Sequence, residues 1–172
     1  GIILRVDNKQ KGFLYVFVAI SHDRRKNLHW GVTARPHSEW AIQQLRQTFD
    51  FDTTTKFVIR DNDGIFSEDF KQTIKRFGLK DTPTAPHSPW QNPFAERVIG
   101  TLRRECLDHI IVLNEKHLRT VLTDYIDNYY NVARTHMSLN KDSPVSRSVQ
   151  PEGKIISTPI LGGLHHIYTR VA

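Results

Sequence analysis

The sequence predicts a mixed α/β domain in which antiparallel strands come first and helices flank the sheet. The prediction comes from apolar, β-branched runs near the start of the chain, helical apolar spacing further along, and short strands between the helices. The antiparallel opening argues against a purely parallel, doubly wound sheet. No glycine-rich phosphate loop follows any strand, which disfavours a nucleotide-binding fold.

The first half of the chain is expected to form a hairpin, a third strand, and two helices around a short buried strand. The charged turn Arg24-Arg25-Lys26 is expected to be solvated, with phosphate contact as the alternative. Pro36 and Ser38 mark the start of the first helix, and Gly78 ends the second. The expected strands are Ile2–Val6, Phe13–Ile20, Leu28–Thr33, Lys56–Arg60 and Leu79–Thr82, and the expected helices are 38–50 and Ser67–Phe77.

The second half is expected to be mainly helical. Residues 83–92, rich in Pro, Ser and His, are predicted to form a mobile loop before a helix that begins at Pro93. A further helix is expected over Leu118–Tyr130. Its inner face would carry Leu118, Leu122, Tyr125 and Tyr129. We divide the chain into a core, residues 1–142, and a C-terminal extension, residues 143–172, expected to be an extended arm or a small hairpin.

Composition limits the class of protein. The 172 residues suit one domain with a short appendage, and a net charge of +6 suits a polyanionic partner. No apolar run approaches the ~20 residues of a membrane span, so we expect no membrane contact. A chain that cannot form an internal disulfide is expected to be intracellular. The single cysteine, Cys106, lies at helical spacing from apolar residues and is expected to be a buried thiol. His165 and His166 lack further ligands at metal spacing and are expected at the surface.

Two carboxylates carry the chemical interpretation. Asp61 ends the apolar run 57–59, and Glu96 lies 35 positions later in a helical pattern followed by Arg103 and Arg104. Acids from a strand end and a helix form a candidate Mg²⁺ site, because Mg²⁺ prefers oxygen ligands and needs few protein carboxylates. Taken singly, Asp61 is typical of a strand-end turn and Glu96 of the first turn of a helix.

Several motifs resemble one family. They are 59–63 (Ile-Arg-Asp-Asn-Asp), 86–97 (Pro-His-Ser-Pro-Trp-Gln-Asn-Pro-Phe-Ala-Glu-Arg), 100–105 (Gly-Thr-Leu-Arg-Arg-Glu) and the later Tyr130-Asn131, Arg134, His136, Ser138-Leu139 and Pro144. In this order they resemble the retroviral-type integrase core that many bacterial insertion-sequence transposases share, with Thr135 in place of the usual Pro. The resemblance runs from about Phe13 to Pro144.

The resemblance implies a ribonuclease H-like fold and a catalytic Asp-Asp-Glu triad that binds Mg²⁺ or Mn²⁺. Asp61 matches the second Asp and Glu96 matches the Glu, at a spacing slightly shorter than expected. The first Asp belongs on the first strand, where the only acid is Asp7. Counting back from Gly12 puts the first Asp of the family about one position away from Asp7. Counting back from Tyr15 puts it near Ile2 or Ile3. If Asp7 is not a ligand, the chain is a truncated or decayed transposase domain.

The resemblance also implies DNA contacts and DNA chemistry. Glu96, Gly100 and Arg103 share a helix face, so Gly100 leaves room for a DNA backbone that Arg103 contacts. Arg104 lies off this face, and it either contacts DNA or only increases the solubility of the protein. Asn92 is either a DNA contact or the N-cap of the helix. We expect DNA cleavage and strand transfer; the alternatives are a non-catalytic DNA-binding remnant and a ribonuclease H-type nuclease. A homo-oligomer is expected, with end recognition supplied by missing segments or another protein.

Overall fold

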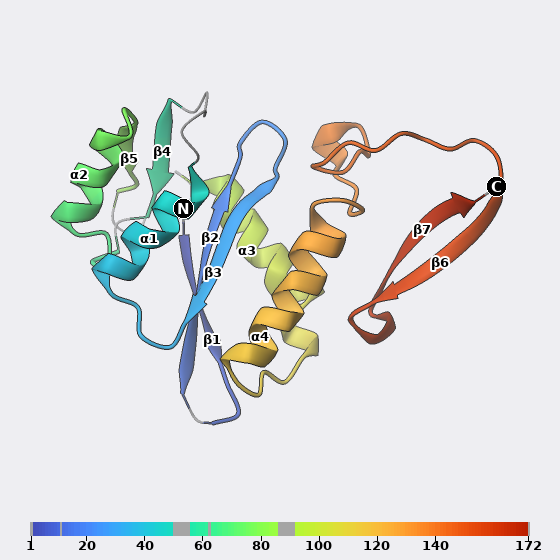
Figure 1. Ribbon diagram of the computed structural model, residues 1–172, viewed down its shortest axis with the longest axis horizontal. Helices are drawn as coiled ribbons and strands as arrows, with labels where there is room; N and C mark the ends of the chain where they lie inside the picture. The colour runs from blue at the N-terminus through green and yellow to red at the C-terminus, as the bar shows by residue number, and fades with distance from the viewer. Residues whose placement is uncertain (1, 11, 50–55, 62, 86–91, 172) are drawn as a thin grey trace. The chain divides into compact units, whose positions relative to one another are not determined.

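The computed structural model describes residues 2–10, 12–49, 56–61, 63–85 and 92–171 (Figure 1). The chain divides into two compact units, which are described separately. The first consists of Gly1–Ile20 and Leu28–Glu115, and the second of Ser21–Asn27 and Lys116–Ala172. The boundary expected between residues 142 and 143 stays a prediction.

The first unit opens on a three-stranded sheet, β1 (Ile2–Asp7), β2 (Phe13–Ile20) and β3 (Asn27–Thr33), with β2 in the centre. β1 pairs antiparallel with β2, and Ile2 lies opposite Val18. Burial alternates along β1, as expected for a strand with one face on a core. Along β2, residues 16–19 are all buried, as expected for a strand covered on both faces. The predicted opening hairpin is confirmed.

A second, parallel sheet joins β4 (Phe57–Arg60) to β5 (Lys80–Pro83). Helices α1 (Ser38–Thr48) and α2 (Glu68–Arg76) pack with both sheets around one core. Ser67 caps α2, and Gly78, with a φ of +71°, follows its end. The sequence predicts one mixed sheet, whereas the described strands of this unit form a separate antiparallel sheet and a separate parallel sheet. The shared core contains Phe17, Ala19, Ala41, Leu45, Val58, Phe66, Phe70, Ile74 and Leu79.

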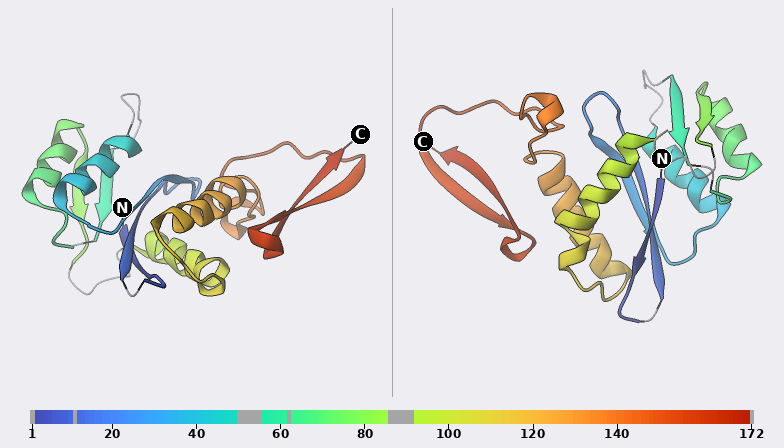
Figure 2. Two further views of the ribbon diagram at one scale, coloured as in Figure 1. Left: turned by 60° about the horizontal axis from the view of Figure 1, so that its bottom comes forward. Right: turned by 180° about the vertical axis from the view of Figure 1, so that it is seen from behind.

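Helix α3 (Pro93–Glu105) crosses the three-stranded sheet on the side away from α1 (Figure 2). Its inner face buries Ala95, Val98 and Leu102, and a short turn, η2 (Leu107–His109), follows. Cys106 is fully buried, and burial raises the pKa of its thiol to about 12. The expected core thiol is therefore confirmed. Most of the loop predicted before α3, residues 86–91, lies outside the described residues.

In the second unit, α4 (Glu115–Leu122) continues as a π-helix, η3 (Thr123–Tyr130), rather than as the predicted α-helix. The wider turn is closed by bonds between residues five apart, such as Asn131 N–H to the Ile126 C=O at 3.0 Å. Tyr125 and Tyr130, five apart, are therefore both buried, with ring centroids 6.2 Å apart. Tyr129, which the sequence predicts on the inner face, is only half-buried, and its ring centroid lies 5.8 Å from that of Tyr125.

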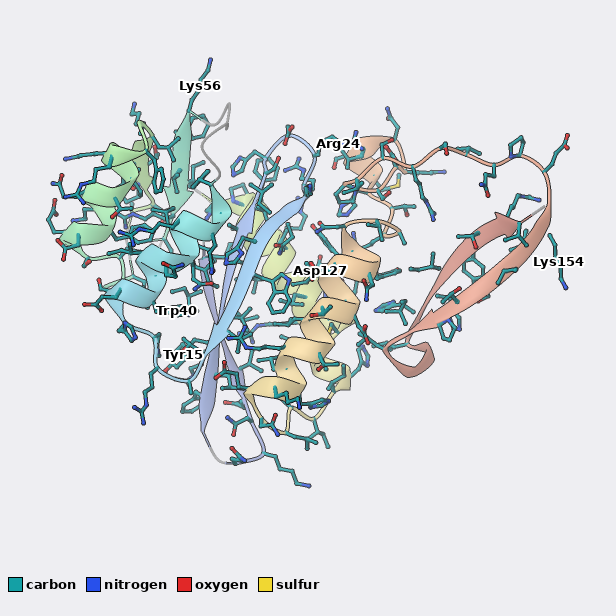
Figure 3. The ribbon with its side chains drawn as sticks, in the orientation of Figure 1. Tyr15, Arg24, Trp40, Lys56, Asp127 and Lys154 are labelled. Atoms are coloured by element: carbon teal, nitrogen blue, oxygen red, sulfur yellow. The ribbon has the colours of Figure 1, made fainter. Side chains whose placement is uncertain are left out.

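The loop between β2 and β3 belongs to the second unit and is tied to the C-terminal segment. The Arg24 guanidinium donates to the Asp142 carboxylate at 2.8 Å and to the backbone C=O groups of residues 143 and 144 (Figure 3). The buried Asn131 side chain accepts from Asn27 N–H at 2.9 Å and donates to the Asn27 C=O at 3.0 Å. The expectation of a merely solvated turn is wrong for Arg24, because its side chain holds two distant segments together.

The chain ends in an antiparallel hairpin, β6 (Lys154–Ile160) and β7 (His165–Val171), joined by η5 (Leu161–Gly163). The hairpin alternative for the tail is confirmed; a single turn, η4 (Met137–Leu139), precedes it. His165 stacks on the Tyr129 ring with centroids 4.5 Å apart. The expectation of a plain surface histidine is therefore wrong for His165, because its ring packs against η3, whereas His166 is exposed.

Candidate catalytic site

Asp61 stands at the carboxyl end of β4, where the sequence predicts it. Parallel pairing sets Arg60 opposite Pro83, and Thr84 N–H donates to the Arg60 C=O at 2.8 Å. Val58 and Arg60 are both buried, so the side chains of β4 fix the strand before Asp61 leaves it. A carboxylate at such a strand end has a defined position without depending on a flexible loop.

Arg60 is a site residue that the sequence interpretation missed. Its guanidinium forms a two-bond fork with Asp81, Nε to Oδ1 at 2.9 Å and Nη2 to Oδ2 at 2.8 Å. The remaining Nη1 donates to the backbone C=O of Asp61 at 3.2 Å. Arg60 is 2% exposed, and a buried cation needs such a carboxylate partner. One feature of the sequence could have indicated this role: Arg60 directly follows the apolar run 57–59 of a predicted buried strand.

The surroundings of the Asp61 carboxyl group disfavour its charged form on balance. Burial first, and the charge of Asp63 second, raise its pKa from 3.8 to about 6. Its Oδ1 atom is buried, and no hydrogen-bond partner for it occurs among the residues that the structure describes. A buried carboxylate oxygen without a donor is expensive in the folded state. A bound cation would remove both penalties, and this chemistry fits a metal ligand.

Glu96 lies in the first turn of α3, which Pro93 begins. The helix N-terminus favours an acid there, so the position alone fits either the structural or the catalytic interpretation. The Glu96 side chain is exposed, while Ala95 and Val98 on either side of it turn into the core. Its carboxylate is therefore held on a rigid helix and remains accessible to solvent and to a substrate.

The basic residues of α3 lie at its exposed side. Arg103 and Arg104 are both exposed. The Arg104 guanidinium lies against Gly100, since a Cβ atom added to Gly100 would come within 2.9 Å of Arg104 Nη1. The space that Gly100 was predicted to leave for a DNA backbone is thus filled by a flexible, positively charged group, which a phosphate is able to attract or displace.

Asn92 occupies the N-cap position of α3 and is only 4% exposed. Its backbone C=O accepts from Glu96 N–H at 3.1 Å, yet its side chain makes no capping hydrogen bond. The buried Nδ2 atom has no partner among the described residues. The side chain therefore does not satisfy the helix end, and its donor is left for a group outside these residues.

Asp7 and the other acids are not gathered into one cluster. No group of three or more His, Cys, Asp or Glu side chains suited to a metal occurs in the described parts of the chain. The residue of β1 that lines a pocket with Asp63 is Ile3. Asp7 lies four residues further along β1, about 13 Å away at the usual rise of a strand. Counting back from Tyr15 puts the first Asp of the triad near Ile2 or Ile3, and Ile3 is the β1 residue beside this pocket.

The pocket beside Asp63 has a volume of about 400 Å³. Tyr15 and Ile3 line it from the sheet, and His37 and Ser38 line it from the start of α1. The Nδ1 atom of His37 caps α1 by accepting from Trp40 N–H at 3.2 Å. Asp63 lines this pocket, and Asp61 lies two residues before it in the sequence.

Comparison with known proteins supports an integrase core. Residues 78–144 match the family model for the integrase core domain. The transposase for insertion sequence element IS904 of Lactococcus lactis is 24% identical over 144 residues. That alignment covers 78% of this chain and 54% of the transposase. The chain therefore spans about half the length of this curated relative.

Solved structures show the same fold. The catalytic core of BIV integrase has a TM-score of 0.56 and 15% identity, over 83% of this chain and 88% of that one. The HTLV-2 integrase catalytic core in complex with magnesium, in its dimeric form, has a TM-score of 0.60 and 12% identity, over 84% of this chain and 92% of that one. Its trimeric form has a TM-score of 0.59 and 13% identity, over 81% and 90%. The ribonuclease H-like fold is confirmed, and residues 78–144 of this fold are similar to the integrase core domain.

None of the helices in the described parts of the chain combines the length and apolar character that a bilayer span requires.

Proposed function

We propose that this chain is the catalytic core of a DNA-integrating enzyme that cleaves phosphodiesters and joins a 3′ hydroxyl to a target strand. The observation that carries the proposal is the buried Oδ1 atom of Asp61, which has no hydrogen-bond partner among the described residues and belongs to a carboxyl group with a raised pKa. It lies at a strand end of an integrase-like fold. A structural turn acid would be expected to have a partner or to face water. Asp61 instead has the properties of a ligand for a cation.

Mg²⁺ or Mn²⁺ is the proposed cofactor, and Asp61 and Glu96 are the proposed ligands. Bound divalent metal would supply Lewis-acid activation of the attacking oxygen and stabilisation of the leaving one. Asp61 fits this role by its unsatisfied oxygen and Glu96 by its accessible carboxylate. Asp7 would join them only after a rearrangement of β1, since Ile3 is the residue of that strand beside Asp63.

The remaining assigned residues act on the DNA. Arg103 and Arg104 present exposed guanidinium groups on α3, where they would contact backbone phosphates beside the Glu96 carboxylate. The Asn92 Nδ2 donor, which has no partner in the parts of the chain that the structure describes, would bind a phosphate or a sugar oxygen at the start of the same helix. Arg60 is a positioning residue, because it holds the Asp61 backbone through Nη1 without reaching a reacting atom.

The assembly of the active protein is part of the proposal. Two DNA ends must be brought together for joining, so a homo-oligomer is proposed; the HTLV-2 core, described in dimeric and trimeric forms, supports it. Selection of specific DNA ends is assigned to segments or proteins outside this sequence. Accordingly, the chain should bind duplexes of different sequence with similar affinity at matched salt.

Metal titration followed by a strand-joining assay tests the function. We expect calorimetry to show Mg²⁺ or Mn²⁺ binding that Asp61→Asn abolishes and the control Asp63→Asn retains. In an assay with labelled oligonucleotides, the wild type should cleave DNA and form joined products. The Asp61→Asn variant should do neither. Metal binding unaffected by Asp61→Asn would overturn the site. Cleavage of RNA–DNA hybrids without joining would favour a ribonuclease H-type nuclease, and DNA binding without metal binding would favour a remnant.

A further inference from the structure

A second candidate ligand site lies in the second unit, between the segment before the hairpin and the hairpin itself. It is a groove of about 430 Å³. Its cationic lining consists of Lys141, Arg147 and Arg170, and Tyr168 provides an aromatic wall. Neither the integrase-core motifs nor the proposed metal site use these side chains.

The hairpin register places the relevant side chains on one face. Ile155 lies directly opposite Arg170 in the β6–β7 pairing, so both point to the same side. Tyr168, two residues before Arg170, shares that side because side chains alternate along a strand. Arg170 is held in place by a hydrogen bond from Nη1 to the Gly153 C=O at 3.1 Å. Tyr168 is 60% exposed, which leaves its ring accessible.

The charge of the groove is not compensated from within. Its one lining acid, Asp142, receives the Arg24 guanidinium on Oδ2 at 2.8 Å and Ser143 N–H on Oδ1 at 2.8 Å. Ion pairs to Lys141, Arg147 or Arg170 are absent among the described residues. Three cations therefore face the groove while its acid is already neutralised, and an anionic ligand is the chemical complement.

We infer that this groove binds the phosphate backbone of DNA. The inference rests on the proposed function, because a core that joins DNA strands must hold duplex outside the reacting bond. Lys141 and Arg147 are exposed side chains on a segment that is open to solvent, and Arg170 lies across from them on β7. Cations spread along an open groove suit successive phosphates of a polymer. A free phosphate ion would bind the same cations as a DNA backbone phosphate. The test below distinguishes these two ligands.

The test measures the salt dependence of duplex binding in the intact chain, with EDTA present so that no metal contributes. The perturbation is the triple variant Lys141→Gln, Arg147→Gln, Arg170→Gln. Each lost phosphate contact lowers the slope of log K against log salt by about 0.9, so the slope should fall by about 2.7. Raising the salt from about 50 to about 200 mM should then weaken wild-type binding about 40-fold more than binding by the variant.

A matched variant controls for net charge. Lys26→Gln, Lys116→Gln, Lys154→Gln removes the same charge from exposed positions of the same unit. Lys154 extends from the outer edge of β6 (Figure 3) and lies on the strand face opposite Ile155. We expect this control to keep most of the wild-type slope. The single variant Arg170→Lys, which preserves charge, should also keep the slope and excludes a loss through unfolding of the hairpin.

Several results would overturn the inference. They are no duplex binding by the wild type, an unchanged slope in the groove variant, and an equal fall in the control. Binding of inorganic phosphate that the groove variant loses, with the DNA slope unchanged, would assign the groove to a small anion instead. Failure of the proposed function is scored separately, by metal titration and strand joining with Asp61→Asn, and neither readout depends on the groove.

Discussion

Replacing Asp61 by Asn should stabilise the metal-free protein at neutral pH. Burial and the neighbouring Asp63 charge raise the pKa of the Asp61 carboxyl group to about 6, so its ionised form is less favourable in the folded chain than in the unfolded one. Asn has nearly the same shape and no charge. It should therefore keep the packing at the end of β4 and remove the cost of ionisation.

The sign and size of the effect follow from linkage. Between pH 3.8 and about 6 the folded chain holds a proton that the unfolded chain has released, so stability falls as the pH rises through this window. At about 1.4 kcal/mol per pKa unit, the upper limit is about 3 kcal/mol. Asp61 is only partly buried, and water screens part of its charge, so we expect about 1–2 kcal/mol at neutral pH and nearly none at about pH 4.

Urea denaturation of both proteins in EDTA at the two pH values measures this difference. The control Asp63→Asn should give a smaller gain, because it lowers the Asp61 pKa while an Asn oxygen still accepts from Ile65 N–H. Saturating Mg²⁺ should reverse the order, since only the wild type binds the ion in the folded state. A variant that is equally or less stable than the wild type in EDTA at neutral pH would refute the argument.

Three further outcomes test neighbouring features. Ile3→Asp should place a carboxylate in the pocket beside Asp63 and raise Mg²⁺ affinity about 10-fold or more by calorimetry, whereas no gain would show that this strand position does not reach the metal. Asp81→Asn should cost about 3 kcal/mol in urea denaturation, because it leaves the buried Arg60 cation without its carboxylate; a loss below about 1 kcal/mol would contradict that role. Asn131→Ala should cost about 2 kcal/mol and speed amide exchange between residues 21 and 27, because the buried backbone groups of Asn27 lose their partner.

Local patterns were sufficient to predict most of the first unit. Alternating and β-branched runs gave the opening strands within a residue or two, and Gly78, with its positive φ, marked the end of α2. The π-helical turn after Leu122 was not predictable, because apolar spacing of three to four residues fits the α-helical period equally well. The decisive evidence is a bond between residues five apart, which only the folded backbone displays.

The sequence predicted the positions of single site residues, but it did not predict their contacts with residues far away in the chain. Asp61 was readable from its place after an apolar strand, but the partner of Arg60 was not, since Asp81 is 21 positions away and pairs with it through parallel strands. The same limit applies to Arg24, whose partner Asp142 is 118 positions distant. A charge run in a turn looks solvated in a sequence until the fold brings a distant carboxylate to it.

The residues that resemble the integrase family therefore divide by what they do. Asn131, within the 78–144 match, fixes a loop of the second unit through the buried Asn27 backbone, and Tyr130 donates from its hydroxyl to the Arg25 C=O at 3.2 Å. These contacts explain why such a signature predicts the architecture, and they carry no catalytic chemistry. Asp61 lies outside that match, so its assignment depends on the motif resemblance of residues 59–63 and on the electrostatics of the β4 end. A negative metal titration would thus remove the proposed chemistry and leave the fold assignment unchanged.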